Sequence, residues 1–595
     1  MSIKTRRISP LFLALVIIRT VNALVISSYF QADEFWQSLE PAHWKAFGYG
    51  EITWEWENKL RSYAFPFMFE IVYRAARFVA KVYETWSNLS AGLLMRCVTV
   101  GFPNWRAAWQ FIWQYRQFNR DVKELIEYTL VIYGPKVAMA LLGATGEFYL
   151  IQFVQKVFAV QRPLQADKKD QTTVLVPVAQ YATILCVTNF FNCFMITRSF
   201  INTFEMDLTC IALYFWDWSG GTNINSTNFT KSLFCAFFVC LQRPTNAFIW
   251  IPLGLFLVMG LLGERKYYEI GKLGFKISYT FTLAFAINLA IDFYFYGELT
   301  FPVYRFFEFN VTSSLSSFYG KSPWHFHLLQ SIPIILGYSI PLVLYGFFKP
   351  EKRNNQQLLT SLSQIKVVII VNIILFSLIP HKEFRFLYML HPLFTALATS
   401  ALLDLSLKYR GLDFRKTRFW ILPLISVIAA MLLSSSHETG VVEVMKYLHN
   451  IPNVQSIGFV MPCHSTPWQS YLHRNDILDL WSISCEPPLF LLKDPSSAEK
   501  LQCYMDESDI LYDDIPLFFQ RNFPPFSLDK DSQSRFNHTW PEFLIIFQHL
   551  DDIFMNDYLR NSGYMKFQSF YNSKSHWDSR RAGDVIIYYR PELIY

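Results

Sequence analysis

Charged residues are scarce in this sequence. Only 17% of its 595 residues are Asp, Glu, Lys or Arg, whereas 52% are hydrophobic and 18% are aromatic. A soluble domain typically carries about 25% charged residues. The shortage excludes an ordinary soluble protein and indicates a polytopic α-helical membrane protein. The net charge of +6 is small for this length and the positive residues fall in short loops, so we expect no nucleic-acid partner.

Common catalytic and metal-binding signatures are missing as well. The sequence has no P-loop, no Gly-x-Ser-x-Gly, no His-Glu-x-x-His, and no CxxC or zinc spacing among its nine cysteines. Asp529-Lys530-Asp531 matches the Asp-x-Asp pattern of metal-dependent nucleotide-sugar transferases. It stands in a Ser/Pro/Asp-rich stretch without a nucleotide-binding signature, so we interpret it as a chance match.

Only three cysteines, Cys463, Cys485 and Cys503, lie outside the apolar part of the chain. In an oxidising lumen, one pair of these could form a disulfide and one thiol would be left over. The sequence does not indicate which pair.

The apolar segments predict about eleven membrane spans by the rule of roughly 20 residues each. A basic start precedes the run 11–26, which has no small-residue cleavage site, so we expect an uncleaved anchor with the N-terminus in the cytosol. Between the spans, residues 84–128 could form an interfacial or extra helix pair. The further spans are expected near 64–83, 131–159, 174–197, 200–216, 231–260, 274–295, 328–348, 366–380, 386–405 and 419–434.

Basic residues in short loops predict which side each loop faces. Loops 262–276, 349–353 and 406–418 are rich in Lys and Arg, which places them in the cytosol. The loops 29–64, 217–230, 296–327 and 381–385 are then lumenal, together with everything after 435. Four glycosylation sequons fall in these lumenal parts, at Asn225, Asn228, Asn310 and Asn537.

The composition changes after Ser434. Residues 1–434 carry the apolar segments, whereas residues 435–595 are polar, mixed in charge and contain alternating apolar runs. We therefore predict a transmembrane module over 1–434 and a lumenal domain of mixed α/β structure over 435–595, a typical domain size.

The stretch His381-Lys382-Glu383-Phe384-Arg385-Phe386 places four ionisable groups between two apolar runs. Charges at a membrane edge usually mark a substrate site. His381, Lys382 and Arg385 together suit a phosphate, because Arg offers a planar fork and Lys a point charge. The alternative is a solvated turn whose basic residues anchor the interface.

An acidic pair, Asp33-Glu34, lies in the first lumenal loop and faces the same compartment. An acid opposite a phosphate-binding group is what transfer from a lipid-linked phosphosugar needs: the carboxylate takes a proton from an acceptor hydroxyl, and the cations stabilise the leaving phosphate. The alternative is a solvated acidic pair. Three further charges lie near the membrane, at Arg198, Glu205 and Asp207. We interpret them as a structural ion pair, and contact with the substrate is the alternative.

The stretch 381–386 resembles the His-Lys-Glu-x-Arg-Phe signature of glycosyltransferase family 22, mannosyltransferases of the endoplasmic reticulum with the GT-C fold. Blocks at 30–40, 198–205, 243–245, 292–297 and 318–325 are similar to further family blocks, in family order. The resemblance implies inverting transfer of mannose from dolichyl phosphate mannose, without a metal or cofactor. It implies Asp33 as the base, with Glu34 as the fallback. The expected substrate contacts are Glu383, Arg61, His325, Trp324 and Tyr319.

Within the family, the blocks 53–57, 61–62 and 462–467 resemble the branch that adds the third mannose, in α-1,2 linkage, to the glycosylphosphatidylinositol (GPI) anchor precursor. The chain departs from the family pattern at Ala32, where Pro is common, and at Met389-Leu390-His391. A sister enzyme acting on the dolichol-linked N-glycan precursor would use the same signature. A lipid or sugar transporter is the alternative of another class, although no inverted repeat supports it.

Overall fold

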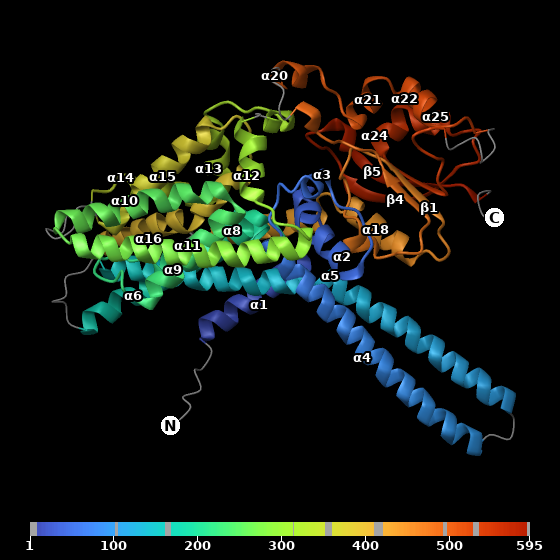
Figure 1. Cartoon of the computed structure of the whole chain (residues 1–595), viewed down its shortest axis with the longest axis horizontal. Coiled ribbons are helices and arrows are strands. Elements are labelled where there is room, and N and C mark those ends of the chain that lie inside the picture. The colour runs from blue at the N-terminus through green and yellow to red at the C-terminus, as the bar shows by residue number, and fades with distance from the viewer. Residues whose placement is uncertain are drawn as a thin grey trace.

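The computed structural model describes residues 9–101, 105–160, 168–312, 315–350, 360–409, 420–491, 497–526 and 535–591. The basic residues before residue 9, most of the basic loop 406–418 and the motif at 529–531 lie outside these ranges. The described chain forms a helical body, a C-terminal domain built on a sheet, and a long helical arm (Figure 1).

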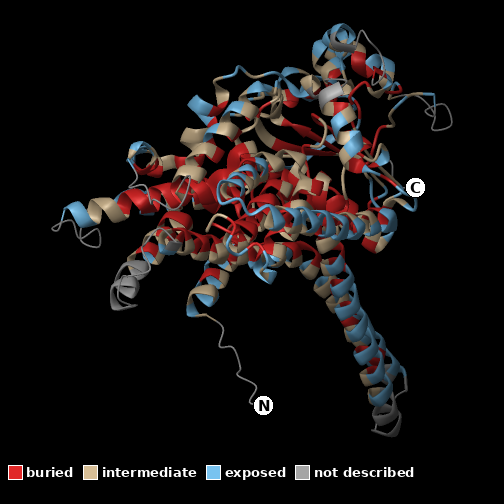
Figure 2. Ribbon diagram, turned by 60° about the vertical axis from the view of Figure 1, so that its left-hand side comes forward, coloured by how far each residue is buried: buried red, intermediate tan, exposed pale blue. Residues whose placement is uncertain are grey.

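The body is a bundle of helices that lie side by side around a buried apolar core (Figures 1 and 2). Arg19 of α1 donates its Nε to Glu147 Oε2 of α5 at 2.7 Å, which ties the first helix into the bundle. The helices are α1 (Pro10–Val25), α5 (Trp105–Val160), α6 (Lys168–Thr188), α7 (Phe190–Met195), α8 (Ile201–Phe215), α9 (Thr227–Gln242), α10 (Ala247–Gly263), α11 (Tyr267–Tyr296), α13 (Ile332–Leu336), α14 (Ile340–Phe348), α15 (Ser361–Leu378), α16 (His391–Lys408) and α17 (Ile421–Ser436).

Six helical segments of the described chain are long and apolar enough to cross a membrane, which confirms a multi-pass membrane protein. A bent pair, 421–436 with 440–450, would be a seventh, and Pro10–Val25 and Pro177–Thr188 are shorter apolar helices. The total of about eleven spans therefore stays a prediction. The six segments are Trp109–Ala159, Pro244–Gly263, Tyr267–Tyr296, His327–Phe348, Ser361–Leu378 and Phe384–Lys408.

The region expected to cross the membrane at 64–83 instead begins a hairpin. Helix α4 (Ala64–Gly101) packs antiparallel to the first half of α5 and both project away from the body (Figure 1). Tyr83 donates to Asn119 Oδ1 at 2.8 Å, and Ser90 contacts the Tyr115 hydroxyl at 2.8 Å. Residues 84–128 thus supply the helix pair that the sequence left open. We call residues 64–130 the arm.

Two ends of the body can be told apart by their contacts. The domain end is defined by residues 29–40, 198–202 and 381–385, which bond to one another. Of these, residues 29–40 contact the C-terminal domain. The far end is defined by residues 214–226 and 261–276. There Lys276 donates to the Ile224 carbonyl at 2.7 Å, and Asn225 donates to Glu269 at 2.8 Å.

This arrangement corrects the predicted sidedness of loop 217–230. The predicted span 231–260 is two helices, α9 and α10, because the chain turns back at Arg243–Asn246, where Pro244 cannot continue the hydrogen bonding of α9. Loop 217–230 therefore lies beside the basic loop 262–276 and not opposite it. Asn225 and Asn228 therefore lie at the far end, together with Glu269 and Lys276, and not at the end that contacts the C-terminal domain.

The C-terminal domain is built on a five-stranded mixed sheet of order β2-β1-β3-β5-β4, which confirms the predicted mixed α/β structure. Strands β2, β1 and β3 are parallel, and β5 is antiparallel to β3 and β4. The strands are β1 (Ser456–Val460), β2 (Asp479–Ser482), β3 (Phe543–Phe547), β4 (Met565–Ser573) and β5 (Gly583–Tyr589), and the helices include α18 (Gly440–Asn450), α19 (Gln469–Leu472), α20 (Ser497–Lys500), α21 (Glu507–Asp513), α22 (Ile515–Asn522), α24 (Gln548–Leu550) and α25 (Asn556–Tyr558).

The two faces of this sheet pack against different partners. Side chains alternate along a strand, so Leu544 and Ile546 belong to a core with α21 and α22. Phe543 and Ile545 belong to a different core, which also contains Tyr29 and Trp36 of the first loop. The short elements of that loop are the π-helical turn η1 (Phe35–Leu39), α2 (Glu40–Phe47) and α3 (Trp54–Glu57). The domain therefore shares its core with the loop that carries Asp33.

The corrected sidedness predicts which sequons carry a glycan. If the domain end faces the lumen, Asn537→Gln should remove one glycan, seen as a gel shift equal to that of endoglycosidase treatment. Asn225→Gln and Asn228→Gln should leave the mobility unchanged, because both sites are at the far end. A glycan on Asn225 or Asn228 together with one on Asn537 would contradict this arrangement of the helices.

Candidate active site

Arg385 is the centre of a cluster of buried charges at the domain end. It follows α15 and lies in the first turn of the 3-10 helix η7 (Phe384–Leu390). Its Nε and Nη2 donate to the two oxygens of Glu383 at 2.8 and 2.9 Å, and Nη2 also donates to Asp33 Oδ2 at 2.5 Å. Its guanidinium lies 5.1 Å from the centre of the Phe200 ring. One guanidinium thus joins two chain segments 352 residues apart.

One nitrogen of Arg385 has no hydrogen-bond partner among the described residues. Nη1 is buried, and Arg385 as a whole is only 6% exposed. A buried donor left unpaired costs about 1–3 kcal/mol, and more when it is charged. Such a donor is suited to an anionic ligand or an ordered water.

Glu383 holds the other groups of the stretch in place. It accepts from Gln31 Nε2 at 3.1 Å, and His381 Nε2 lies 3.3 Å from its other oxygen. Burial raises the pKa of Glu383, but the charge of Arg385 and the hydrogen bond from His381 outweigh it and hold the pKa well below its usual range. Burial lowers the pKa of His381, but Glu383 outweighs it and raises the pKa above its usual value. Both of these effects favour an ionised pair.

Lys382 points away from this cluster. Its ammonium donates to the Ser322 carbonyl at 2.9 Å, and the residue is 6% exposed. The structure therefore brings together three of the four predicted groups of the stretch, His381, Glu383 and Arg385, and uses Lys382 to fix the neighbouring loop.

The acidic pair in the first loop divides between two partners. Asp33 faces Arg385 and its side chain is 28% exposed. Glu34 points the other way, where its Oε2 accepts from Arg198 Nη1 at 2.9 Å, and that guanidinium also donates to the Ser28 carbonyl and hydroxyl. Both side chains of the Glu34–Arg198 pair are buried. Asp33 thus has its carboxylate at the cluster, whereas the carboxylate of Glu34 is buried in an ion pair with Arg198.

Two further arginines lie close to the cluster. Arg61, which was predicted from the sequence, donates its Nη2 to Glu55 Oε1 at 2.7 Å. Its backbone carbonyl accepts a hydrogen bond from the Tyr296 hydroxyl. Arg243 was not assigned to the site from the sequence. Its Nε lies 3.5 Å from Glu205 Oε2, and its guanidinium lies over the Phe386 ring. The signal that could have found Arg243 is a charge followed by proline at a break between two apolar helices.

The predicted contacts in the segment 319–325 differ in position. The Tyr319 ring lies 6.2 Å from the His381 ring, so it borders the cluster. Trp324 is 67% exposed and packs edge-on against His325. The structure does not bring this Trp–His pair to the Arg385 cluster.

The block 462–467 of the C-terminal domain lies against the first loop. Tyr29 donates to the His464 carbonyl at 2.5 Å and Trp36 donates to the Thr466 carbonyl at 3.1 Å. A disulfide joins Cys463 to Cys485 and leaves Cys503 as the free, exposed thiol. Within the described residues, only Cys463, His464 and Cys485 are spaced to hold a metal, and their sulfurs are taken by the disulfide.

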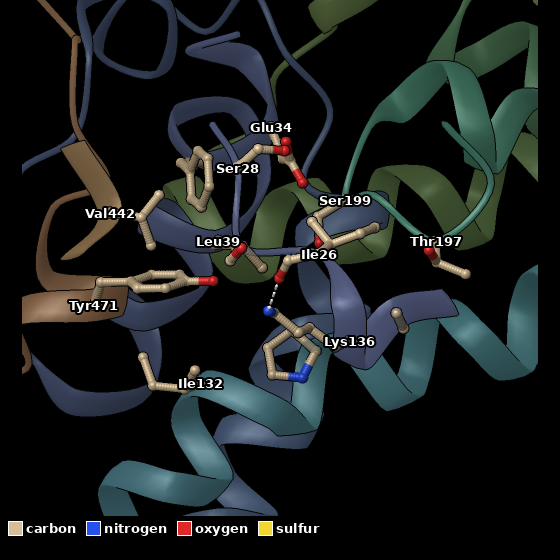
Figure 3. Close-up of a pocket in the computed structure, with 14 residues that line it drawn as sticks. Ile26, Ser28, Glu34, Leu39, Ile132, Lys136, Thr197, Ser199, Val442 and Tyr471 are labelled. Carbon is tan, nitrogen blue, oxygen red and sulfur yellow. Dashed lines mark hydrogen bonds between the residues drawn. The ribbon is translucent and has the colours of Figure 1, made fainter. Parts of the chain in front are cut away.

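A small cavity lies behind Glu34 (Figure 3). It is lined by the end of α1, the middle of α5 and Tyr471, and Lys136 of its lining donates to the Ile26 carbonyl at 2.5 Å. The space that a water-sized sphere can occupy in it is about 20 Å³, which has room for about one water molecule. It is too small for a sugar.

Comparison with known proteins shows that the sequence matches a family. Residues 10–473 match the model of the Alg9-like mannosyltransferase family. The chain is 51% identical to GPI mannosyltransferase 3 of Candida glabrata (98% of this chain, 96% of the relative) and 45% identical to that of Saccharomyces cerevisiae (99% and 98%). It is 27% identical to GPI alpha-1,2-mannosyltransferase 3 of Mus musculus (98% and 89%).

A solved structure shares the fold. The chain is similar to ArnT from Cupriavidus metallidurans, solved with undecaprenyl phosphate bound, with a TM-score of 0.51, 11% identity and 97% of both chains covered. At this identity the likeness concerns the fold alone, and it confirms the predicted GT-C architecture.

The division of the acidic pair predicts that the two carboxylates contribute differently to stability. Glu34→Gln should lower the free energy of unfolding by roughly 3–5 kcal/mol, because it leaves the buried Arg198 charge uncompensated. Asp33→Asn removes the same charge from a partly exposed side chain and should cost much less. Thermal unfolding of the two purified variants in detergent measures this difference. Equal melting temperatures would contradict the structural role of Glu34.

Proposed function

This chain belongs to the Alg9-like mannosyltransferase family, and from this premise we propose that it transfers the third mannose of the GPI anchor in α-1,2 linkage. The donor is dolichyl phosphate mannose and the acceptor is the GPI precursor with two mannoses. That the chain is a mannosyltransferase of GPI-anchor synthesis follows from the family and from relatives at 45–51% identity over nearly its whole length. The names of these relatives, and of the mouse protein, support the linkage and the position of the added sugar.

The observation that carries the chemistry is the buried, unpaired Nη1 of Arg385 beside Asp33. The donor phosphate would bind Nη1 through a charge-assisted hydrogen bond, and would replace Asp33 on Nη2 for the second bond of the fork. Arg61 and Arg243 add positive charge around the same position. We assign no role in phosphate binding to Lys382, because its ammonium is held by the Ser322 carbonyl.

The reaction is an inverting displacement. A hydroxyl oxygen of the acceptor attacks the anomeric carbon of mannose and forms the new C–O bond, while the bond from that carbon to the phosphate oxygen breaks. The electron pair leaves with dolichyl phosphate, whose charge Arg385 stabilises. Asp33 accepts the hydroxyl proton. In this proposal the guanidinium supplies the charge stabilisation, so no metal ion is required.

The ion pair between Arg385 and Asp33 supports an order for these events. In the structure, Nη2 binds both Glu383 and Asp33. A phosphate that takes up this nitrogen would release the Asp33 carboxylate, while Glu383 keeps the guanidinium in place. Donor binding would thereby free the base for the acceptor.

The same proposal sets the orientation in the membrane of the endoplasmic reticulum. Residues 1–434 form the transmembrane catalytic module with a cytosolic N-terminus, and residues 435–595 form a lumenal domain. The far end carries Lys272 and Lys276, as expected of a cytosolic face. The domain end, with the cluster, then opens to the lumen.

The direct assay uses purified enzyme with labelled dolichyl phosphate mannose. Mannose should pass to a two-mannose GPI lipid, and the product should be sensitive to an α-1,2-mannosidase. Transfer to a dolichol-linked N-glycan precursor instead would overturn the proposed acceptor while leaving the mannosyltransferase assignment intact. Loss of transfer on chelation of divalent cations would overturn the proposed independence from metals.

Asp33→Asn should lower the turnover number by roughly 100- to 10,000-fold, the usual contribution of a general base. Asn keeps the size of the side chain but cannot accept the proton. The melting temperature should stay close to that of the unchanged enzyme, which separates lost chemistry from lost folding. Normal turnover in this variant would remove Asp33 from the mechanism.

Arg385→Lys should also be impaired, although it keeps the positive charge. A lysine cannot form two parallel bonds to phosphate and also hold Glu383. Loss of one such bond in a dry site costs about 2–4 kcal/mol, or roughly 30- to 1000-fold in rate. Arg385→Ala serves as the comparison at matched expression. Full turnover and donor affinity in Arg385→Lys, with loss in Arg385→Ala, would show that Arg385 acts only as a charged anchor.

A further inference from the structure

The arm carries an apolar face that no part of the described chain covers. On α4 the side chains of Phe78, Val82, Trp86, Leu89 and Leu93 are between 51% and 67% exposed. Their spacing of three and four residues places them on one face of the helix. The inward face is different, since it holds the small residues Ala76, Ala80 and Ala91, which are buried against α5.

Helix α5 presents a matching face. Phe111, Phe118 and Leu125 recur every seven residues and are about half to two-thirds exposed, so they also share one side of their helix. Figure 2 shows that the outer surfaces of the arm are exposed along its length.

The opposite side of the hairpin is basic. Lys123 of α5 forms an ion pair of 3.1 Å with Glu84 of α4, which shows where the polar faces of the two helices meet. Arg77 and Lys81 precede Glu84 by seven and three residues. Arg116 and Arg120 precede Lys123 by the same two spacings. They therefore share the side of the hairpin on which this pair lies. The apolar residues of α4 and α5 are turned by a large angle from it.

Exposed apolar side chains also occur farther along α5, at Tyr133, Val137 and Leu141. They belong to the segment Trp109–Ala159, which is long and apolar enough to cross a membrane. The half of the arm that α5 forms is therefore in one helix with a segment whose composition suits lipid.

We propose that the arm is a membrane-surface hairpin, with its apolar face in the lipid at the domain end and its basic face toward headgroups and water. Lipid fits better than a protein partner because of the composition of the arm. Trp109 and Trp113 lie at helical spacing with Arg116 and Arg120, and Trp, Arg and Lys together are typical of the headgroup level. The basic side also complements anionic lipids.

The location of the arm suggests what it does for the enzyme. Its base lies near the cluster, since Arg61, three residues before α4, is close enough to Asp33 and Arg385 to interact with their charges. Tyr128 at the other end donates to the Tyr471 carbonyl of the C-terminal domain. An arm held in the leaflet would fix the height of the site above the bilayer, where two lipid-linked substrates must meet. This inference does not depend on which sugar is transferred.

The test measures the surroundings of single spin labels on the full-length protein in lipid nanodiscs containing phosphatidylcholine and phosphatidylinositol. The labels are attached in a background that carries Cys97→Ser and Cys503→Ser, and the background protein is labelled in parallel. Val82→Cys reports on the apolar face and its neighbour Lys81→Cys on the basic face. Phe118→Cys and Arg120→Cys repeat the comparison on α5, should one variant of the first pair fail to fold.

Collision with oxygen, which concentrates in lipid, is compared with collision with a water-soluble nickel chelate. We expect the oxygen-to-nickel ratio to be several-fold higher at Val82→Cys than at Lys81→Cys, and higher at Phe118→Cys than at Arg120→Cys. Equal access of the nickel chelate to both faces would show that the arm stands in water and overturn the proposal. Low access of both reagents to the apolar face would show a covering protein, such as a second copy, and would overturn it as well.

Discussion

The site depends on the buried guanidinium of Arg385, which binds Glu383 and Asp33 and, in our proposal, the donor phosphate. Burying a charge is costly unless it is paired and hydrogen-bonded. Arg385 meets this cost through Glu383 and Asp33, and it keeps one nitrogen unpaired. Glu383 is held in turn by His381 and Gln31. The arrangement leaves room in the hydrogen-bond network for one anion, and it places the proposed base beside that anion.

The C-terminal domain holds the other half of this arrangement. The loop that carries Asp33 has no sheet or long helix of its own, so its position depends on what it packs against. Tyr29 and Trp36 bond to the block 462–467, and they share a hydrophobic core with strands β1, β3 and β5. Glu40 accepts hydrogen bonds from Trp468 and Ser470, and burial raises the pKa of Glu40 to about 7. The C-terminal domain therefore positions the loop that carries the proposed base, a role that composition alone did not reveal.

Much of the site could be predicted because its charges stand out in an apolar sequence. His381, Glu383, Arg385 and Asp33 do meet, although chain order leaves their distance open. What could not be predicted is how charges pair. Glu34 pairs with Arg198, and Lys382 donates to the Ser322 carbonyl, because the fold brings these partners close to them. Hydropathy likewise shows that residues 231–260 are apolar, but not that the chain reverses at Arg243–Asn246, which changes the side of Asn225.

The central claim is that the donor phosphate takes up the guanidinium of Arg385 and releases Asp33. A cryo-electron microscopy structure of the full-length enzyme with a phosphonate analogue of dolichyl phosphate mannose tests it most directly. The account predicts two hydrogen bonds from Arg385 to the phosphonate, Glu383 still bound to the guanidinium, and Asp33 separated from it and facing the anomeric carbon. An intact ion pair between Arg385 and Asp33, with the phosphonate bound elsewhere, would contradict it.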